Sequence, residues 1–378
     1  MRVTVVSHTY VVAANHGKLE ELARMPEVEL SVICPRKIRR QFGVYPVERT
    51  AHSAYRIVPL RALYHSHNCR FLYLGLARAL SHLHPDVLHL EEEPWSLAAW
   101  QALRFKRRHP ATRFVFFTWE NRFRRWGFPH AGVERAVLRE ADAAIAGNAE
   151  AAEVLRKKGF EREVEVIPQL GLDADHFTKR DESQLREELG LRGTAVGFAG
   201  RLVPEKGIGL LLEALAGLEG DWSLLVVGGG PMLDEVRARL SKPPFAGRAT
   251  LLPTVPHAEM PRYLNCMDIL VLPSVEAPHW KEQFGHVLIE AMSCEVPVVG
   301  SSCGEVPNVI GEAGVVFPEG DVEALRSSLA RLLASPEERH RLGRAGRQRV
   351  AQNYTDRTIA ARTMALWQRV VGGGEAAG

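Results

Sequence analysis

The stretch AVGFAGRLVPEKGIGLLLEALAGL, residues 195–218, begins with an apolar run, passes through a loop with glycine and two cations, and ends in an apolar segment with helical spacing. A short β-rich run followed by a helical pattern is the repeating unit of a parallel α/β sheet. The same alternation continues on both sides of this stretch. The sequence therefore predicts an α/β protein throughout.

Strand and helix patterns alternate in two series, which separate near residues 167–177, where Pro168 and Gly171 interrupt both periodicities. Helices are expected at 71–83 and 96–108, and strands at 3–7, 29–34, 86–90, 113–117, 141–147, 163–168, 195–200, 222–228, 249–253, 268–273 and 297–302. A chain of 378 residues also favours two domains. We predict two facing Rossmann-like domains with parallel sheets and an interdomain cleft: residues 1–170, with a C-terminal helix at about 355–370 packing back on them, and residues 171–354.

The composition is that of an ordinary globular protein, with 46% hydrophobic and 25% charged residues. The five cysteines are scattered without a CxxC pair, which favours a reduced, cytoplasmic protein with neither disulfides nor structural zinc. The sequence contains neither a signal-peptide pattern nor a run of apolar residues long enough to span a membrane.

Two loops of the second half are candidates for binding phosphate. Gly200, Arg201 and Lys206 follow the strand at 195–200, and two cations at a strand end suit a diphosphate, although a solvated basic loop would look the same. The glycines of VVGGGPM (226–232) indicate close approach of the backbone to another group. Leu233 stands where a dinucleotide fingerprint would need its third glycine, which disfavours a dehydrogenase.

The stretch HWKEQFGHVLIEAM (279–292) places Glu282 before a predicted helix at 286–293 and Glu290 within it. The backbone N–H groups at the start of that helix are a ready site for a diphosphate. Carboxylates on either side of a diphosphate can accept hydrogen bonds from hydroxyl groups. We therefore expect the two glutamates to bracket a nucleotide sugar.

Together GRLVPEKG, VVGGGP, LPS, EQFGHVLIEAM and PVVGSSCGEVP resemble the motif series of family-4 retaining glycosyltransferases, which have the GT-B fold. The resemblance covers most of residues 160–350 and implies a C-terminal domain that binds the donor and an N-terminal domain that binds the acceptor. It implies that Arg201 and Lys206 bind the donor diphosphate, Glu290 the ribose and Glu282 the transferred sugar. The other donor contacts implied are Phe284, Gly285, His286, Val287, Leu288, Gly200, Gly228, Gly230 and, for the base, Val255.

The first half departs from the family pattern at two points. Ala13-Ala14 stands where the family usually has Gly-Gly, and Glu120 stands where many members have a histidine that faces the donor sugar. We expect Glu120 to contact the sugar in that place, and the alternative is a helix-capping or surface acid. The expected acceptor contacts are His8, Asn15, Lys18, Glu91, Glu93 and Trp95. The alternative is a solvated loop for Glu91, Glu93 and Trp95, and a structural histidine for His8.

No metal is expected at the donor site. The DAD segment (173–175) has the pattern of a metal-binding motif but falls between the domains, and two cations with a helix N-terminus already suffice for a diphosphate. The resemblance implies substitution on the front face of the sugar, with the leaving diphosphate taking the acceptor's proton and with no cofactor. The substrate expected is a UDP-hexose, with a GDP-sugar as the second choice.

Two other functions share this fold. A sugar-nucleotide epimerase would use the same diphosphate site without an acceptor, and a nucleotide-sugar binding module would leave the sugar attached. Product analysis separates both from a transferase.

The first half is basic, with 26 Lys and Arg against 18 Asp and Glu in residues 1–170. The cations gather in residues 35–42, 104–110 and 121–128, interleaved with Phe42, Phe105, Phe123, Trp126 and Phe128. Such segments favour an anionic membrane surface, and nothing resembles a nucleic-acid module. We expect an enzyme that docks on the inner membrane face and extends a glycan or lipid-linked acceptor in polysaccharide or cell-envelope biosynthesis. A soluble surface is the alternative.

Overall fold

A computed structural model describes residues 1–40, 43–48, 54–63 and 71–373. The chain divides into two compact units, Met1–Gly171 with Asp356–Gly378, and Leu172–Thr355. The chain therefore leaves the first unit and returns to it with α14 (Asp356–Gly372). The domains predicted from the sequence differ from these units by one residue at each boundary.

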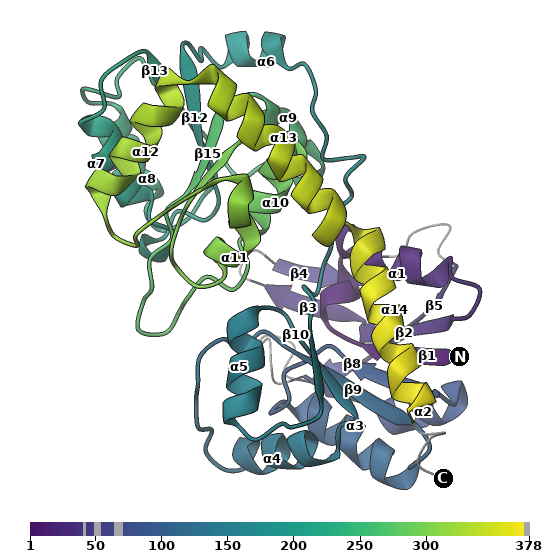
Figure 1. Ribbon diagram of the computed structural model, residues 1–378. Coiled ribbons are helices and arrows are strands. Elements are labelled where there is room, and N and C mark those ends of the chain that lie inside the picture. The colour runs from purple at the N-terminus through teal and green to yellow at the C-terminus, as the bar shows by residue number, and fades with distance from the viewer. Residues whose placement is uncertain (41–42, 49–53, 64–70, 374–378) are drawn as a thin grey trace. The chain divides into compact units, whose positions relative to one another are not determined.

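The first unit contains a parallel seven-stranded sheet in the order β11-β10-β9-β8-β1-β2-β5 (Figure 1). Its strands are β1 (Arg2–Val6), β2 (Glu29–Pro35), β5 (Arg56–Leu60), β8 (Val87–Leu90), β9 (Arg113–Thr118), β10 (Ala143–Ala146) and β11 (Glu163–Val166). The sheet is built outward in one direction from β1 and in the other from β8. The order therefore reverses between these two strands, and such reversals are where open parallel sheets bind ligands.

Helices cover both faces of this sheet because successive side chains of each strand point to opposite faces. Val3 and Val5 pack with α1 (Gly17–Ala23) and α14, while Val6 lies in a second core with α2 (Leu76–Leu83), α3 (Leu97–Arg108) and α4 (His130–Glu140). α5 (Ala149–Lys157) follows β10.

The second unit contains a parallel six-stranded sheet in the order β14-β13-β12-β15-β16-β17. Its strands are β12 (Thr194–Ala199), β13 (Trp222–Val227), β14 (Ala249–Leu252), β15 (Ile269–Leu272), β16 (Val298–Ser301) and β17 (Val315–Phe317). Its helices are α6 (Ser183–Glu188), α7 (Ile208–Ala216), α8 (Leu233–Leu240), α9 (Met260–Asn265), α10 (His286–Ser293), α11 (Val306–Ile310), α12 (Val322–Ala334) and α13 (Pro336–Asn353). Here the order reverses between β12 and β15.

Some elements differ from the prediction. The helix expected at 71–83 begins at Leu76, because residues 72–73 form β7 (Leu72–Tyr73), paired with β6 (Ala62–Leu63). The helix expected at 96–108 begins at Leu97, since Ser96 is its N-cap and accepts a hydrogen bond from the Ala99 N–H at 3.0 Å. The edge strands β5 and β17 and the hairpin of β3 (Lys37–Arg40) and β4 (Gly43–Pro46) were not predicted. Short 3-10 helices lie at Thr9–Val11, Ala13–Asn15, Pro204–Lys206, His257–Glu259 and Gly311–Ala313.

Within the described ranges, no helix is long and apolar enough to cross a membrane.

Candidate functional site

The loops after β12 and β15 lie at the reversal of the second sheet. The loop after β12 carries Arg201 and Lys206, and the loop after β15 leads through Glu282 into α10. Both loops leave the carboxyl ends of adjacent parallel strands. The sequence therefore brings the predicted diphosphate and sugar contacts to one edge of the sheet.

The glycine-rich loop after β13 packs directly on the loop after β12. Gly228 has φ +152°, and a Cβ there would lie 1.9 Å from the Gly200 carbonyl oxygen; at Gly230 it would lie 2.5 Å from that of Leu202. The Leu202 N–H donates to the Gly229 carbonyl at 2.9 Å. The close approach indicated by the sequence is thus between two loops of the protein itself, and contact of these glycines with a donor stays a prediction.

Lys206 and Glu282 form an ion pair at 2.5 Å, with side chains 16% and 7% exposed. Glu282 also accepts a hydrogen bond from Ser274 Oγ at 2.8 Å, and the Lys206 ammonium lies 5.0 Å from the ring centroid of Trp280. The two groups expected at diphosphate and sugar are therefore neighbours, as the two parts of a nucleotide sugar require. Neither Ser274 nor Trp280 was singled out from the sequence.

Arg201 is exposed and forms no ion pair or side-chain hydrogen bond with any residue that the structure describes. Its guanidinium is therefore available to an anion.

The predicted helix at 286–293 is confirmed as α10. Gly285 precedes it with φ +80°, a left-handed conformation that glycine adopts without strain. The Phe284 side chain is buried against Tyr354, with ring centroids 5.5 Å apart. The Leu288 N–H donates to the Gly285 carbonyl at 2.8 Å, so the expected donor contact of Leu288 is not supported through that amide. The first amides of the helix, at His286 and Val287, remain the candidates for a phosphate.

Glu290 is buried in α10 and accepts a hydrogen bond from His257 Nε2 at 3.1 Å. That bond raises the pKa of His257. It also ties the loop of Val255, which is partly buried, to α10. Next to Glu290, burial lowers the pKa of His286 and keeps its imidazole neutral, and its Nε2 has no hydrogen-bond partner in the described part of the chain.

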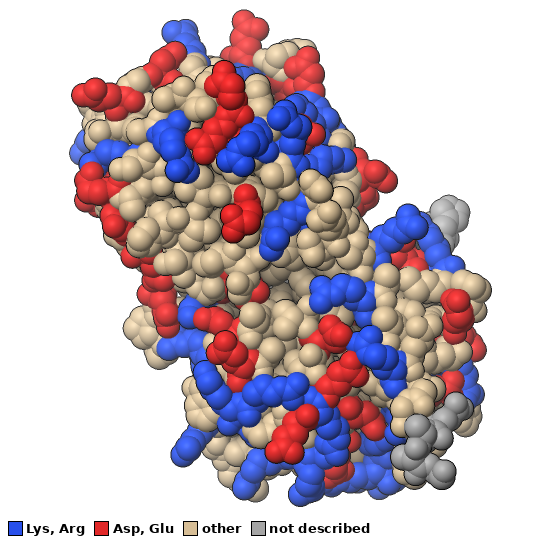
Figure 2. All heavy atoms as spheres, viewed as in Figure 1, with Lys and Arg blue, Asp and Glu red and all other residues tan. Residues whose placement is uncertain are grey.

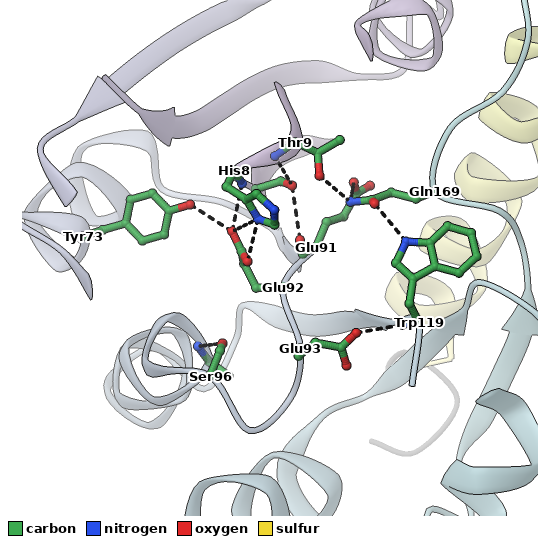
Figure 3. A network of polar contacts seen from close by, with 11 residues as sticks. His8, Thr9, Tyr73, Glu91, Glu92, Glu93, Ser96, Trp119 and Gln169 are labelled. Atoms are coloured by element: carbon green, nitrogen blue, oxygen red, sulfur yellow. Dashed lines mark hydrogen bonds and ion pairs between the residues drawn. The ribbon is translucent and has the colours of Figure 1, made fainter. Parts of the chain in front are cut away.

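At the reversal of the first sheet, three consecutive glutamates after β8 turn to three sets of partners (Figure 3). Glu91 is enclosed by Lys18 Nζ at 2.5 Å, Tyr10 OH at 2.6 Å and Gln169 Nε2 at 3.1 Å. Burial alone would raise the pKa of Glu91, but the charge of Lys18 lowers it. Because the two side chains are only 3% and 1% exposed, the prediction that Lys18 and Glu91 contact an acceptor is corrected: they form an internal ion pair.

The other two glutamates face different strands. Glu92, which the sequence analysis did not select, accepts hydrogen bonds from the His8 backbone N–H and from Tyr73 OH. Glu93 accepts hydrogen bonds from Thr118 Oγ1 at 2.6 Å and from the Trp119 N–H at 2.9 Å. Burial raises the pKa of Glu93 to about 7.

Glu120 forms an ion pair within the first unit. Its carboxylate pairs with Lys158 Nζ at 3.0 Å, and the same ammonium contacts Glu134 at 2.6 Å. Lys158 follows α5 and Glu134 lies in α4, and the sequence could not relate either residue to Glu120. A contact of Glu120 with the donor sugar stays a prediction, with Lys158 as a neighbour of its carboxylate.

The remaining predicted acceptor contacts are occupied by protein neighbours. The Asn15 amide donates to the Thr9 carbonyl at 2.8 Å. Trp95 stacks on Trp126 with centroids 4.0 Å apart, and its indole Nε1 is buried without a partner among the described residues. Of the predicted set, His8 has a partly exposed ring at the sheet reversal, with 22% of its side chain exposed.

The DAD segment forms a turn. Asp173 accepts hydrogen bonds from the N–H groups of Asp175 and His176, both at 3.0 Å.

The basic and aromatic segments of the first unit are only partly as expected. Figure 2 shows Lys and Arg gathered over the part of this unit that holds α3 and α4. Phe123 and Phe128 are 50% and 96% exposed, but Phe105 is buried and stacks on His109, and Trp126 packs on Trp95. Phe42 lies outside the described residues. Within residues 104–110 and 121–128, the exposed aromatic side chains are thus Phe123 and Phe128.

Two family models match the chain, one for each half. The model described as glycosyl transferases group 1 matches residues 180–349, and the model described as glycosyltransferase family 4 matches residues 18–174.

Curated relatives match part of their lengths. The chain is 32% identical over 206 residues to the GDP-mannose-dependent alpha-(1-6)-phosphatidylinositol monomannoside mannosyltransferase of Mycolicibacterium smegmatis, over 52% of this chain and 54% of that protein. It is 28% identical over 251 residues to the 2-deoxystreptamine glucosyltransferase of Streptomyces kanamyceticus, over 64% of each. The chain thus matches less than two thirds of either relative.

Solved structures match over nearly the whole chain. Sucrose-phosphate synthase from Thermosynechococcus elongatus gives a TM-score of 0.75 at 19% identity, over 99% of this chain and 100% of that one. Anabaena Alr3699/HepE in complex with UDP gives 0.74 at 16% identity, over 97% and 98%. These likenesses confirm the predicted GT-B fold with its two Rossmann-like domains.

Proposed function

The chain belongs to the group 1, or family 4, glycosyltransferases, and on that premise we propose that it moves a hexose from a nucleotide sugar to a hydroxyl group of its acceptor, with retention of configuration. The observation that carries this proposal is the pairing of Lys206 with Glu282 at the reversal of the second sheet, beside the start of α10. A cation, a carboxylate and a helix N-terminus at one edge match the chemistry of a diphosphate linked to a polyol.

The donor is held by positively charged and N–H groups at its diphosphate and by carboxylates at its hydroxyl groups. Arg201, Lys206 and the first amides of α10 bind the diphosphate, Glu290 accepts hydrogen bonds from the ribose, and Glu282 accepts them from the transferred sugar. Lys206 already contacts Glu282, so a bound donor would place its diphosphate and its sugar at adjacent groups. The base lies against the loop of Val255. A UDP-hexose is the first donor to test and GDP-mannose the second.

The reaction proceeds on one face of the sugar. The acceptor oxygen bonds to the anomeric carbon as the bond to the diphosphate breaks, and the leaving oxygen takes the proton of the acceptor hydroxyl. Arg201 and Lys206 stabilise the charge that grows on the diphosphate, where preorganised electrostatics lower the barrier most. These cations support a reaction without a metal ion or cofactor.

The acceptor is a polyhydroxylated ring, free or within a glycan or lipid. Two relatives are named for a phosphatidylinositol mannoside and for 2-deoxystreptamine, both of which contain such a ring. This acceptor class suits a role in building polysaccharides or the cell envelope.

A lipid-linked acceptor would require the first unit to approach a membrane. We propose that residues 121–128 dock on the anionic inner leaflet, since exposed Phe123 and Phe128 flank Arg124 and Arg125. Each basic residue near such a surface contributes about 1 kcal/mol of binding free energy.

Liposome flotation tests this docking: Arg124→Glu with Arg125→Glu, and separately Phe123→Ser with Phe128→Ser, should weaken binding. Val316→Ser, which changes an exposed apolar residue of the second unit, should not. Absence of binding to anionic vesicles at low salt would leave a soluble acceptor.

Product analysis tests the proposed activity. The protein is incubated in excess EDTA with UDP-glucose or GDP-mannose and with myo-inositol, myo-inositol 3-phosphate or 2-deoxystreptamine, and products are identified by mass spectrometry and NMR. We expect an α-linked product from these α-linked donors. Conversion of the donor without an acceptor would indicate an epimerase, and binding without any product would indicate a binding module. Loss of activity in EDTA with rescue by magnesium or manganese would overturn the metal-free mechanism.

A further inference from the structure

His8 is held in one orientation at the reversal of the first sheet. It follows β1, and Glu92 follows β8, the adjacent strand. Glu92 accepts a hydrogen bond from the His8 backbone N–H at 2.8 Å, and its oxygens lie 3.0 and 2.9 Å from His8 Nδ1. The imidazole also stacks on Phe71, with centroids 4.9 Å apart and planes 20° apart. The ring is therefore fixed on one edge and one face.

Glu92 is itself firmly placed. Its side chain is 1% exposed, and it accepts a further hydrogen bond from Tyr73 OH at 3.0 Å. Burial raises the pKa of Tyr73 well above its ordinary value, so the phenol keeps its proton and can only donate to the carboxylate. Figure 3 shows Tyr73 and His8 reaching Glu92 from different elements.

This arrangement decides which imidazole nitrogen faces outward as a base. An ionised carboxylate only accepts hydrogen bonds, so Nδ1 of His8 carries the proton that lies towards Glu92. In the neutral ring, Nε2 then has a lone pair. No described residue bonds to Nε2, and His8 is partly exposed. By contrast, the carboxylates of Glu91, Glu92 and Glu93 are all occupied by protein donors.

We propose that His8 Nε2 accepts a hydrogen bond from one hydroxyl group of the acceptor, with Glu92 as the residue that positions the imidazole. This inference rests on the proposed function and assigns part of the acceptor site to the first unit. A ring nitrogen with a fixed lone pair suits a polyol hydroxyl, which can donate to it. His8 holds the hydroxyl in place, and the proton still leaves with the diphosphate.

Kinetics of three variants test the assignment. His8→Leu removes the acceptor atom, and His8→Gln replaces it with an amide oxygen. His109→Leu is the matched control, because His109 also stacks on a phenylalanine, in α3's C-terminal turn, but has no carboxylate partner among the described residues. Loss of one hydrogen bond predicts that His8→Leu raises the acceptor KM about tenfold, with a smaller rise for His8→Gln. The donor KM should not change in any variant. An unchanged acceptor KM in His8→Leu would overturn the proposal.

A chemical test is independent of turnover. Diethyl pyrocarbonate modifies unprotonated imidazole nitrogens, and we expect it to modify His8 and to be blocked there by saturating myo-inositol. His109 should not be protected, and Glu92→Gln should weaken the protection of His8. Modification of His8 that myo-inositol leaves unchanged would contradict the proposal. If the wild type forms no product with any donor and acceptor of the panel, the proposed activity fails, and the protection experiment still decides the polyol contact.

Discussion

Each unit of this molecule places a lysine against a glutamate at the reversal of its sheet, with the same 2.5 Å separation. Lys18 and Glu91 in the first unit are 3% and 1% exposed, whereas Lys206 and Glu282 in the second are 16% and 7% exposed. Glu91 is further bonded to Tyr10 and Gln169. The Lys206 ammonium instead faces the ring of Trp280. A lysine–glutamate pair thus stabilises the fold in the first unit, where it is enclosed. In the second unit the pair is more exposed and is open to a ligand.

The largest expected effect breaks the enclosed pair. Lys18→Met leaves the Glu91 charge buried without its partner, and removal of one member of a buried pair costs about 3–5 kcal/mol. We expect the free energy of unfolding, from chemical denaturation, to fall by about this amount.

The control for this prediction is an exposed pair. Lys157→Met removes the partner of Glu153, and both side chains are more than 60% exposed. Such pairs on a helix contribute about 0.3–0.5 kcal/mol. If the two variants lose similar stability, the enclosed pair does not have the structural role assigned to it.

The second expected effect concerns the open pair. Lys206→Met and Arg201→Ala each remove a cation from the proposed diphosphate site and should raise the barrier to transfer by about 2.7–4 kcal/mol, judged from other charge-stabilising donors. Turnover numbers measure this. Arg237→Ala, which removes an exposed arginine of α8, is the control. Near-normal turnover in both site variants would refute the proposed donor site.

A third effect concerns Glu93. Burial raises the pKa of its carboxyl group from 4.5 to about 7. Between these values the folded protein holds a proton that the unfolded chain releases, so stability falls as pH rises from about 4.5 through 7 and then levels. Glu93→Gln should be more stable than the wild type by about 3 kcal/mol at pH 8 and equal to it near pH 4. Denaturation at several pH values checks this, and parallel pH curves for the two proteins would contradict it.

The sequence was a good guide where local pattern decides structure. Central strands such as β12 and β13 are buried on both faces and read as apolar runs, and Gly285 marked the start of α10. Edge strands were missed because β5 and β17 are short and only partly buried.

The sequence could not predict which side chains far apart in the chain form ion pairs. Lys18 and Glu91 are 73 residues apart, and Glu120 and Lys158 are 38 apart, so only the folded sheet brings them together. The sequence shows three adjacent acids at the end of a strand. It does not show which of them is enclosed by a lysine and which one positions His8. Similarly, burial of Phe105 follows from the face of α3 that meets the sheet.

Hydrogen–deuterium exchange with added nucleotide tests the central claim, that the second unit binds the donor at the reversal of its sheet. Exchange is measured for the wild type with UDP and with GDP. At least one of the two nucleotides should slow exchange of the backbone amides in residues 200–207 and 283–290, and the effect should be lost in Lys206→Met. Peptides covering residues 91–96 of the first unit should be unchanged. If neither nucleotide protects the second-unit loops, or protection appears only around residues 8–18 and 91–96, the assignment of the open lysine–glutamate pair to the donor is wrong.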